Sequence, residues 1–280
     1  MLSMQSGRWA EPMATNFHLE LTGGTQGQEV KNGPMTVSIA RLPLLGALIV
    51  SALTTPGMAL EIRARADTVV ELFTSQGCSS CPSADELLGE LGAREEIIAL
   101  GYHIDYWDYI GWQDTFALPE NTQLQKAYAQ SWGKTRIYTP QMVINGAHAV
   151  VGSDANEAEA AIADAHAPLE IALTAQGEEA VLLDVDGDDA LPAAVVWLVT
   201  YRDGAEVEID RGENSGRALA YTNIVTDRQA IGMWDPQSGA EISIPLQEVL
   251  GDHSDGAAVI IQEKNGNLPG RILGAAAFHR

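Results

Sequence analysis

The chain has 280 residues, of which 46% are hydrophobic, so it has enough apolar side chains for one or two folded cores. It carries 16 basic and 38 acidic residues, which gives a formal net charge of −22. A surface with this charge repels phosphate backbones and anionic lipid headgroups, so we expect neither a nucleic-acid partner nor binding to membrane surfaces. The composition carries no information on the oligomeric state.

The N-terminal segment has the composition of a targeting signal. Residues 1–34 are polar and rich in glycine, and we interpret them as an upstream extension that is not native, with Met35 as the natural start. Residues 35–59 are predicted to be a signal peptide, because the apolar run Leu42–Leu53 would span only ~18 Å as a helix and Gly57-Met58-Ala59 has the small-x-small pattern of a cleavage site. We therefore expect a periplasmic or secreted protein; an uncleaved membrane tether is the alternative.

Strand and helix patterns alternate between residues 60 and 166. The β-branched, apolar run Thr68–Thr74 is typical of a buried strand, and apolar residues recur at helical spacing from Cys81 to Leu91. Asp154 with Glu157 resembles a capping box at the start of an alanine-rich helix. The other predicted elements are a strand at Ile97–Ile104, a helix around Leu124–Trp132, a strand from Thr139 into an Asn145-Gly146 turn, and a strand at His148–Val151.

From residue 167 onward, short strand patterns follow one another and no helix pattern separates them. Strands at this spacing are typical of an antiparallel sandwich. We therefore predict two domains, an α/β domain over residues 60–166 and a mainly antiparallel β domain over residues 167–280. The predicted strands of the second domain are Leu169–Thr174, Ala180–Val185, Ala193–Tyr201, Val207–Ile209, Leu219–Met233, Glu241–Pro245, Ala257–Gln262 and Ile272–Phe278.

Both cysteines of the chain lie in one short stretch, Ser75-Gln76-Gly77-Cys78-Ser79-Ser80-Cys81-Pro82. A structural disulfide stabilises most when it closes a long loop, whereas this pair encloses only two residues, so the pair indicates chemistry. Cys78 would lie where the helix dipole and unpaired N–H groups stabilise a thiolate, which makes it the candidate nucleophile. Cys81, one turn on and more buried, is the candidate resolving thiol.

We expect no cofactor and no metal site. The sequence has no second CxxC, and its six histidines have no paired-ligand spacing. The stretch Asp184–Asp189 mimics a calcium loop, but its glycine is at the fourth position and no glutamate closes it, so we interpret it as a hairpin turn.

The dipeptide Thr139-Pro140 supports redox chemistry. A CxxC that follows a strand and opens a helix is the redox arrangement of the thioredoxin fold. In that fold a cis-proline begins the strand that faces the cysteines and exposes the preceding backbone to a substrate peptide. The alternative is that a proline at the start of a strand only marks the end or edge of that strand. We predict that Pro140 is a catalytic-site residue and that Thr139 binds substrate.

Four stretches resemble a bacterial family of exported thioredoxin-like proteins known as a domain of unknown function, DUF 1223. The resemblance covers roughly residues 67–278 and implies a thioredoxin-like domain followed by a β-rich C-terminal part, but no established activity. Thioredoxin itself has Gly-Pro where this chain has Ser79-Ser80, so the resemblance implies nothing about the reduction potential. The stretches are VVELFTSQGCSSCPSAD, YHIDYWDYIGWQD, RIYTPQMVINGAHAVVGS and RGENSGRALAYTNIV.

Glu71 is a further catalytic candidate. It lies in the first strand, seven residues before Cys78, where a related fold keeps a buried acid that helps to move a proton from the second cysteine. The alternative is a glutamate that only makes a structural hydrogen bond.

Nine of the 17 aromatic residues fall between Tyr102 and Tyr138. We predict that Tyr106, Trp107 and Trp112 bind substrate; the alternative is that these aromatics complete a small core. His103 is interpreted as a hydrogen-bonded strand residue rather than a ligand. The stretch Arg211–Gly216 is predicted to be a tight loop between strands, without an assigned function.

The sequence thus predicts a thioredoxin-like α/β domain followed by a sandwich-like β domain, in an exported thiol–disulfide oxidoreductase. Its substrates would be proteins or small molecules that carry thiols or disulfides. One alternative is a redox-inactive binding protein on the same scaffold, which would resist mild reductants. Another is a Cu(I)-handling protein with both thiolates as soft ligands.

Overall fold

The structure, a computed structural model, describes residues 60–251 and 253–280. The predicted upstream extension and signal peptide lie outside these residues. None of the helices within the described ranges is long and apolar enough to cross a membrane. The elements in chain order are β1 (Glu61–Ala66), β2 (Thr68–Thr74), α1 (Pro82–Gly92), β3 (Ile97–His103), the 3-10 helix η1 (Asp108–Ile110), α2 (Pro119–Ser131), β4 (Gln141–Ile144), β5 (His148–Val151), α3 (Ala155–Ala163), β6 (Ala172–Gln176), β7 (Ala180–Val185), β8 (Ala194–Ile209), β9 (Arg217–Trp234), β10 (Ala240–Pro245), α4 (Leu246–Val249), β11 (Gly256–Asn265) and β12 (Leu268–His279).

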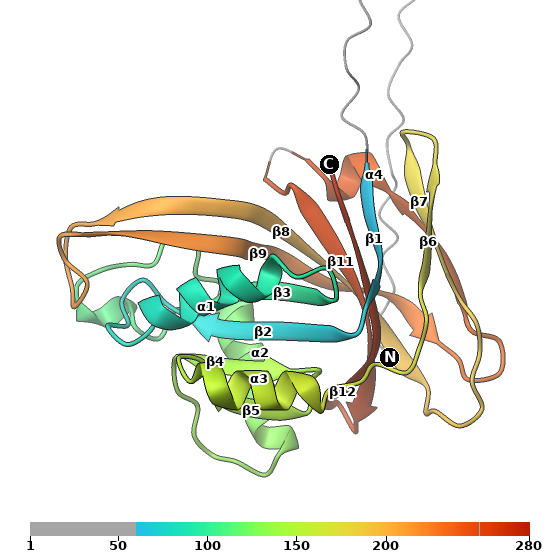
Figure 1. Cartoon of the computed structure of the whole chain (residues 1–280), viewed down its shortest axis with the longest axis horizontal. Helices are drawn as coiled ribbons and strands as arrows, with labels where there is room; N and C mark the ends of the chain where they lie inside the picture. Colours follow the sequence, from blue (N-terminus) through green and yellow to red (C-terminus); the bar gives the residue numbers. More distant parts are fainter. Residues whose placement is uncertain (1–59, 252) are drawn as a thin grey trace, which may run out of the picture. The chain divides into compact units, whose positions relative to one another are not determined.

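One nine-stranded sheet dominates the fold (Figure 1). Its strand order is β1-β12-β11-β8-β9-β3-β2-β4-β5, and a second sheet has the order β10-β7-β6. β2 pairs with β3 in parallel, and β3 meets β9 in parallel at Gly101 and Ile224. The other neighbours run antiparallel. The protein is therefore mostly β, and its mixed sheet contains strands from both halves of the chain.

The prediction of a thioredoxin-like α/β domain followed by a sandwich-like β domain is wrong. The core between α2 and the large sheet contains Phe73 and Tyr128 from the first half of the chain and Val225 and Ile260 from the second. Strands on both sides of the expected domain boundary near residue 166 share one sheet. The physical reason is that β9 joins an edge of β3 that would otherwise expose unpaired backbone groups. Hydrophobic patterning predicts a strand but does not specify its neighbour.

Most of the predicted local elements are nevertheless present. β2 and α1 flank the cysteines as predicted. Asp154 caps α3, because its carboxyl group accepts a hydrogen bond of 3.0 Å from the backbone N–H of Glu157. Asn145 lies in the turn between β4 and β5. The Thr139–Pro140 peptide bond is cis, as predicted.

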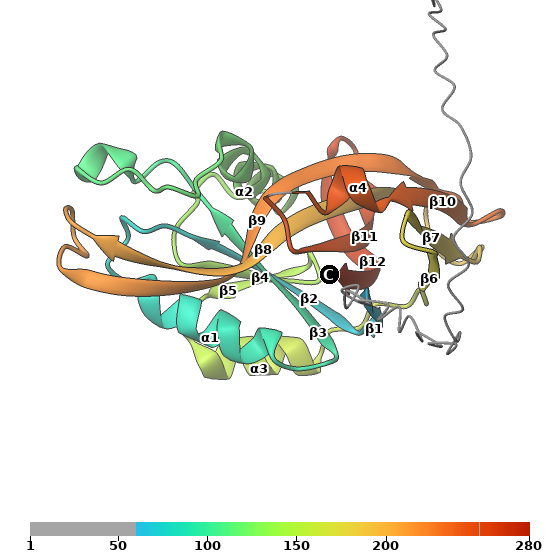
Figure 2. The ribbon, with the colours of Figure 1, turned by 90° about the horizontal axis from the view of Figure 1, so that it is seen from above.

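Helices cover both faces of the part of the large sheet that leads to the cysteines (Figure 2). α1 and α3 pack on one face, where Leu72 is buried against Leu88. α2 packs on the other face, where Tyr128 is buried. The smaller sheet has its own core with the rest of the large sheet, and this core includes Trp234 and Phe278.

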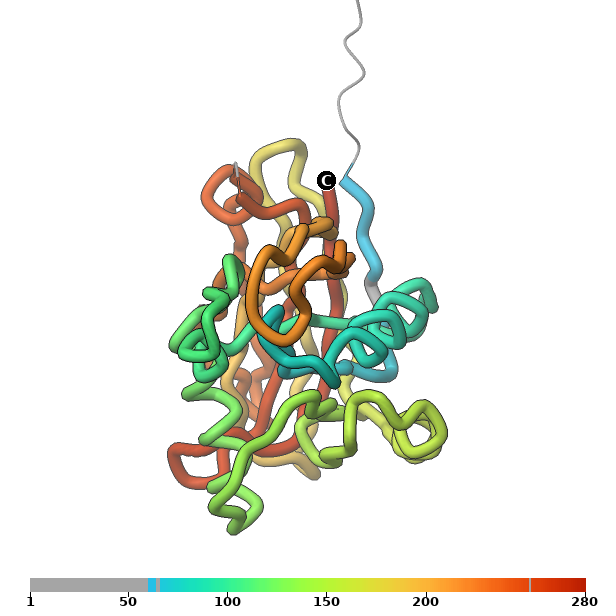
Figure 3. The backbone as a smooth tube through the Cα atoms, turned by 90° about the vertical axis from the view of Figure 1, so that its left-hand side faces the viewer, coloured from blue at the N-terminus to red at the C-terminus, as the bar shows by residue number. Residues whose placement is uncertain are grey.

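The strands β8 and β9 form a long hairpin, with 16 and 18 residues (Figure 1). Its distal half has a small core in which Ile209 and Tyr221 pack against Trp112 and Phe116 from the loop before α2. The hairpin therefore reaches well beyond β3, and its end lies near the start of α1 (Figure 3).

Asn145 joins three strands and provides a test of this architecture. The residue is buried and has a left-handed φ of 45°. Its Oδ1 accepts a 2.6 Å hydrogen bond from the N–H of Val69, and its backbone carbonyl accepts one from the N–H of Ile272. Asn145→Ala should lower the free energy of unfolding by about 2–4 kcal/mol, because the Val69 N–H loses its partner and alanine disfavours positive φ.

Urea denaturation measures this change. Asn145→Gly is the matched variant, since glycine accepts the backbone conformation and loses only the side-chain hydrogen bonds, so its loss should be smaller. An alanine variant within about 0.5 kcal/mol of the wild type would contradict this role for Asn145.

Candidate active site at the Cys78–Cys81 disulfide

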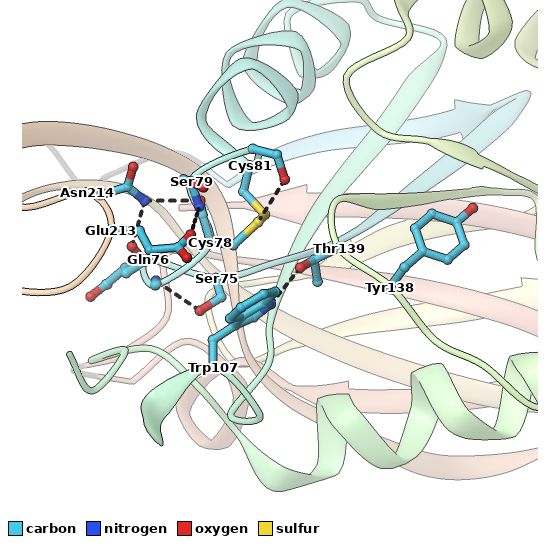
Figure 4. The surroundings of a disulfide bond; sticks show 12 residues. Ser75, Gln76, Cys78, Ser79, Cys81, Trp107, Tyr138, Thr139, Glu213 and Asn214 are labelled. Atoms are coloured by element: carbon cyan, nitrogen blue, oxygen red, sulfur yellow. Dashed lines mark hydrogen bonds between the residues drawn. A yellow bond between two sulfur atoms is a disulfide. The ribbon is translucent and has the colours of Figure 1, made fainter. Parts of the chain in front are cut away.

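The two cysteines form a disulfide in the dithiol loop, which we define as residues 75–81 between β2 and α1. Figure 4 shows this disulfide and its surroundings. Cys78 and Cys81 are 1% and 0% exposed, whereas Ser79 and Ser80 are exposed. We predicted that Cys81 is the more buried cysteine. The structure buries both cysteines, so burial does not distinguish them.

The local sequence places Cys81 at the first turn of α1. Its carbonyl accepts hydrogen bonds from the N–H groups of Ala84 and Asp85, and Pro82 occupies a first-turn position where a missing N–H costs nothing. The N–H of Cys81 in turn donates to the carbonyl of Cys78. The disulfide therefore lies at the positive end of the helix dipole, which favours a thiolate over a thiol.

The hydroxyl group of Ser80 also lies close to the disulfide. Its Oγ is 3.5 Å from the Sγ of Cys78. A hydroxyl at this position can donate a hydrogen bond to a sulfur atom that becomes anionic. The Ser-Ser dipeptide thus contributes a polar group that Gly-Pro would lack.

Gln76 anchors the dithiol loop to the aromatic loop, which we define as residues 105–116. Its backbone N–H donates a 2.8 Å hydrogen bond to Oδ2 of Asp114, and the same oxygen lies 2.8 Å from Nδ1 of His103. The side-chain oxygen of Gln76 accepts a 2.8 Å hydrogen bond from Nε1 of Trp112. Asp114 and His103 are buried, so the start of the dithiol loop rests on an enclosed polar network.

Trp107 connects the aromatic loop to Thr139. Its Nε1 donates a 2.7 Å hydrogen bond to Oγ1 of Thr139, and its Cβ lies 3.2 Å from the site where Gly77 would carry a side chain. Trp107 and Tyr109 stack with their planes 11° apart, and Tyr109 is 81% exposed. Two predicted substrate-binding residues, Trp107 and Thr139, therefore lie together beside the dithiol loop.

Pro140 lies against the first turn of α1. A side chain on Gly152 would meet Pro140 at 3.1 Å and Ala84 at 3.2 Å, so glycine is needed where these segments approach. The N–H of Gly152 donates to the carbonyl of Pro140 and holds it there. The structure thus brings the predicted catalytic proline close to the helix that carries Cys81.

Tyr106 and Glu71 point to other parts of the molecule. The hydroxyl of Tyr106 donates to the side chain of Gln125 in α2, and burial raises the pKa of Tyr106 to about 12. Glu71 accepts a 2.6 Å hydrogen bond from the hydroxyl of Tyr128, and burial raises its pKa even though Arg228 lies nearby. Because Glu71 alternates with Leu72, it lies on the sheet face opposite α1.

Asp85 is an acid near the cysteines that sequence reasoning missed. It is buried in α1, four residues after Cys81, so the two side chains lie on one face of the helix. Burial raises its pKa to about 7, and the nearby His103 limits the rise. The sequence did contain a signal for this site, because Asp85 is a carboxyl group on the apolar helix stripe that begins with Cys81.

The end of the β8–β9 hairpin also contacts the dithiol loop and was not predicted to do so. We define the hairpin tip as residues 210–216. Asn214 donates hydrogen bonds to the carbonyl oxygens of Gln76 (2.9 Å) and Cys78 (3.0 Å), and Glu213 accepts one from the N–H of Ser79 (Figure 4). No local pattern could reveal contacts between residues this far apart in the chain.

Within residues 60–251 and 253–280, no group of three or more His, Cys, Asp or Glu side chains is arranged to hold a metal ion. A groove of about 720 Å³ lies between α2 and β8, β9 and β11, with Trp197 and Arg228 in its wall, and its lining includes no residue of the dithiol loop.

Asp85 leads to a testable pH dependence. The ordinary pKa of Asp85 is 3.8, and in the folded protein it is about 7. At pH values between these two, the folded protein keeps a proton on Asp85 that the unfolded chain has lost. The stability from this proton is present at low pH and is lost as the pH rises through about 7. Asp85→Asn cannot ionise, so from pH 4 to pH 8 its free energy of unfolding should rise relative to the wild type, by at most about 4 kcal/mol.

Urea unfolding at several pH values measures this difference. Glu90→Gln removes an exposed carboxylate farther along α1 and is the matched control, which should follow the wild-type pH profile. Parallel profiles for Asp85→Asn and the wild type would contradict a raised pKa at Asp85.

The family of the chain follows from one family model. The model of the family described as "Protein of unknown function (DUF1223)" matches residues 69–262. Among solved structures, protein AGR_C_4864 from Agrobacterium tumefaciens is similar, with 32% identity, a TM-score of 0.68, and coverage of 76% of this chain and 94% of that one. HBP35 of Porphyromonas gingivalis has a similar fold, at 16% identity and a TM-score of 0.51, over 76% of this chain and 74% of that one. The search of curated proteins gives no match. With a family match across most of its length, the chain belongs to the DUF1223 family.

Proposed function

We propose that the protein is a thiol–disulfide oxidoreductase that acts on protein or small-molecule thiols and disulfides. The observation that carries this proposal is the position of the Cys78–Cys81 disulfide, at the start of α1 and near Thr139 (Figure 4). A structural disulfide that encloses only two residues would add little stability. A disulfide at a helix N-terminus is instead chemically activated, since each sulfur becomes a good leaving group.

The reaction is a two-step exchange. A substrate thiolate attacks the sulfur of Cys78, an S–S bond forms between substrate and Cys78, and the Cys78–Cys81 bond breaks with its electron pair on Cys81. A second substrate thiolate then attacks the mixed disulfide and releases Cys78 as a thiolate. The substrate dithiol loses two electrons and becomes a disulfide, while the cysteine pair gains two electrons. The reverse sequence reduces a substrate disulfide, with Cys78 as nucleophile and Cys81 as resolving thiol.

Asp85 is the group best placed to exchange a proton with Cys81. It lies one helical turn from Cys81, and a pKa of about 7 lets it both give and take a proton near neutral pH. Glu71, the earlier candidate, instead contacts Tyr128 on the other face of the sheet. We therefore assign proton exchange to Asp85.

The surface beside the disulfide suits an extended polypeptide. Trp107 and Tyr109 provide stacked aromatic rings, and Thr139 lies next to them. Aromatic side chains supply contact area at low entropic cost. We further propose that the protein is exported, because residues 35–59 have the short apolar run and the small-x-small pattern of a signal peptide.

One observation favours a second candidate function. Cys78 and Cys81 are nearly inaccessible in the disulfide form, at 1% and 0% exposure. A redox-inactive binding protein of the same fold would be expected to bury its disulfide in this way. The two functions differ in whether the disulfide exchanges in the folded state.

Replacement of each cysteine separates the two functions. Reduced Cys81→Ser should form a stable mixed disulfide with oxidised glutathione through Cys78, because the resolving attack is lost. Cys78→Ser should form roughly tenfold less. Mass spectrometry of the intact protein measures both adducts, and iodoacetamide should alkylate Cys78 before Cys81 in the reduced wild type. Slow, equal alkylation with no adduct in Cys81→Ser would support the redox-inactive function instead.

A further inference from the structure

The hairpin tip is built to hold one conformation. Gly212 and Gly216 have left-handed φ values of 80° and 81°. A side chain at Gly212 would also approach Trp112 of the aromatic loop at 3.2 Å. The N–H of Gly216 donates to the carbonyl of Ile209 and closes the turn. These constraints account for the glycines in the sequence Arg211–Gly216.

Asn214 is the buried centre of the hairpin tip, with 1% exposure. Its Nδ2 donates to the carbonyls of Gln76 and Cys78, and its Oδ1 accepts a 3.0 Å hydrogen bond from Arg217. Both atoms of the amide are therefore used, and the opposite orientation would place its oxygen against two carbonyl oxygens. The carbonyl of the reactive residue Cys78 is thus fixed by a residue 136 positions later in the chain.

Glu213 places a carboxylate beside the reactive pair. Its Oε2 accepts a 3.3 Å hydrogen bond from the N–H of Ser79, the residue that follows Cys78. In Figure 4, Glu213 and Asn214 lie on one side of the disulfide, and Trp107 and Thr139 lie on the other. Since Ser79 and Glu213 are exposed, a substrate that reaches the sulfur atoms passes near this charge.

We propose that the hairpin tip is part of the reactive site: Asn214 positions the dithiol loop, and Glu213 selects thiol substrates by charge, in favour of those with a positive group next to the sulfur. This inference rests on the proposed function and names the substrate class. A cationic thiol would be attracted to Glu213 as its sulfur approaches Cys78, whereas an anionic thiol would be repelled. A protein substrate would accordingly carry Lys or Arg near its reactive cysteine.

Three small thiols of different charge test this selection: cysteamine, 2-mercaptoethanol and mercaptoacetate. The rate at which each reduces the native disulfide is measured at low ionic strength and expressed per thiolate. The attacking sulfur bonds to a cysteine sulfur, the Cys78–Cys81 bond breaks, and a second thiol completes the two-electron reduction. The ratio of the cysteamine rate to the mercaptoacetate rate removes effects that all thiols share.

Glu213→Gln should lower this ratio by about two- to fivefold, which is the range for one exposed charge. Glu213→Lys should lower it further, and salt should weaken the wild-type preference. Glu206→Gln is the matched control, because Glu206 is an exposed carboxylate farther back on the same hairpin, and it should leave the ratio close to that of the wild type.

Asn214→Ala tests the positioning role. The variant keeps Glu213 but frees the tip, so the ratio should fall as in Glu213→Gln, and the rate with neutral 2-mercaptoethanol should rise. Loss of stability alone would not change the ratio between thiols of opposite charge. Circular dichroism verifies that each variant is folded before its rates are compared.

Three results would overturn the proposal. If Glu213→Gln keeps the wild-type ratio, Glu213 does not select substrates. The proposed function is tested separately, by the mixed disulfide that Cys81→Ser forms with glutathione. If Asn214→Ala keeps the wild-type ratio, Asn214 does not hold the dithiol loop in place beside Glu213. If no thiol reduces the folded wild type, both the proposed function and this inference fail.

Discussion

The backbone of Gln76 is held on both sides by side chains from distant segments. Its N–H donates to Asp114, 38 residues later, and its carbonyl accepts from Asn214, 138 residues later. Because Gln76 is fully buried, each of these backbone groups needs a partner, and an unpaired one would cost about 1–3 kcal/mol. The conformation of the dithiol loop therefore depends on the aromatic loop and the hairpin tip as much as on β2 and α1.

The nine-stranded sheet makes this arrangement possible. β9 joins β3 at Gly101, where a side chain would meet the carbonyl of Thr222 at 3.2 Å. From there the hairpin continues over Trp112 and Phe116, and its tip reaches the start of α1. The second half of the chain thus contributes residues to the same site as the cysteines, which a fold of two independent domains would not require.

The resulting site combines three chemical features. The helix dipole and the Ser80 hydroxyl favour a thiolate at Cys78, whereas the Glu213 carboxylate opposes it. Burial raises the pKa of Asp85, which lies one helical turn after Cys81, to about 7. Under the proposed function, the balance between these effects would set which cysteine reacts and with which partners.

The sequence was sufficient for the local elements around the cysteines but not for their neighbours. A β-branched, apolar run identified β2 and helical periodicity identified α1, and the position of Thr139-Pro140 indicated a segment beside the cysteines. The sequence predicted two short strands, Ala193–Tyr201 and Val207–Ile209, where the structure has the single strand β8, which runs through Gly204. Gly204 is needed there because a side chain would meet the carbonyl of Tyr221 at 2.7 Å.

The missed site residues have a common cause. Asn214 and Glu213 act through contacts with residues more than a hundred positions away, and one sequence carries no signal of such contacts. Asp85 was visible as a polar residue on an apolar helix stripe, but its surroundings depend on His103 and the packed sheet. Glu71 was assigned by its distance in sequence from Cys78, and strand alternation turns it to the opposite face.

The central claim is that the Cys78–Cys81 disulfide exchanges electrons in the folded protein. Equilibration of the wild type in dithiothreitol and glutathione buffers, followed by alkylation and mass spectrometry, measures the fraction of reduced pairs. Circular dichroism records the fold in each buffer. The account predicts one reversible two-electron transition while the protein stays folded. A disulfide that becomes reducible only when the protein unfolds would contradict it.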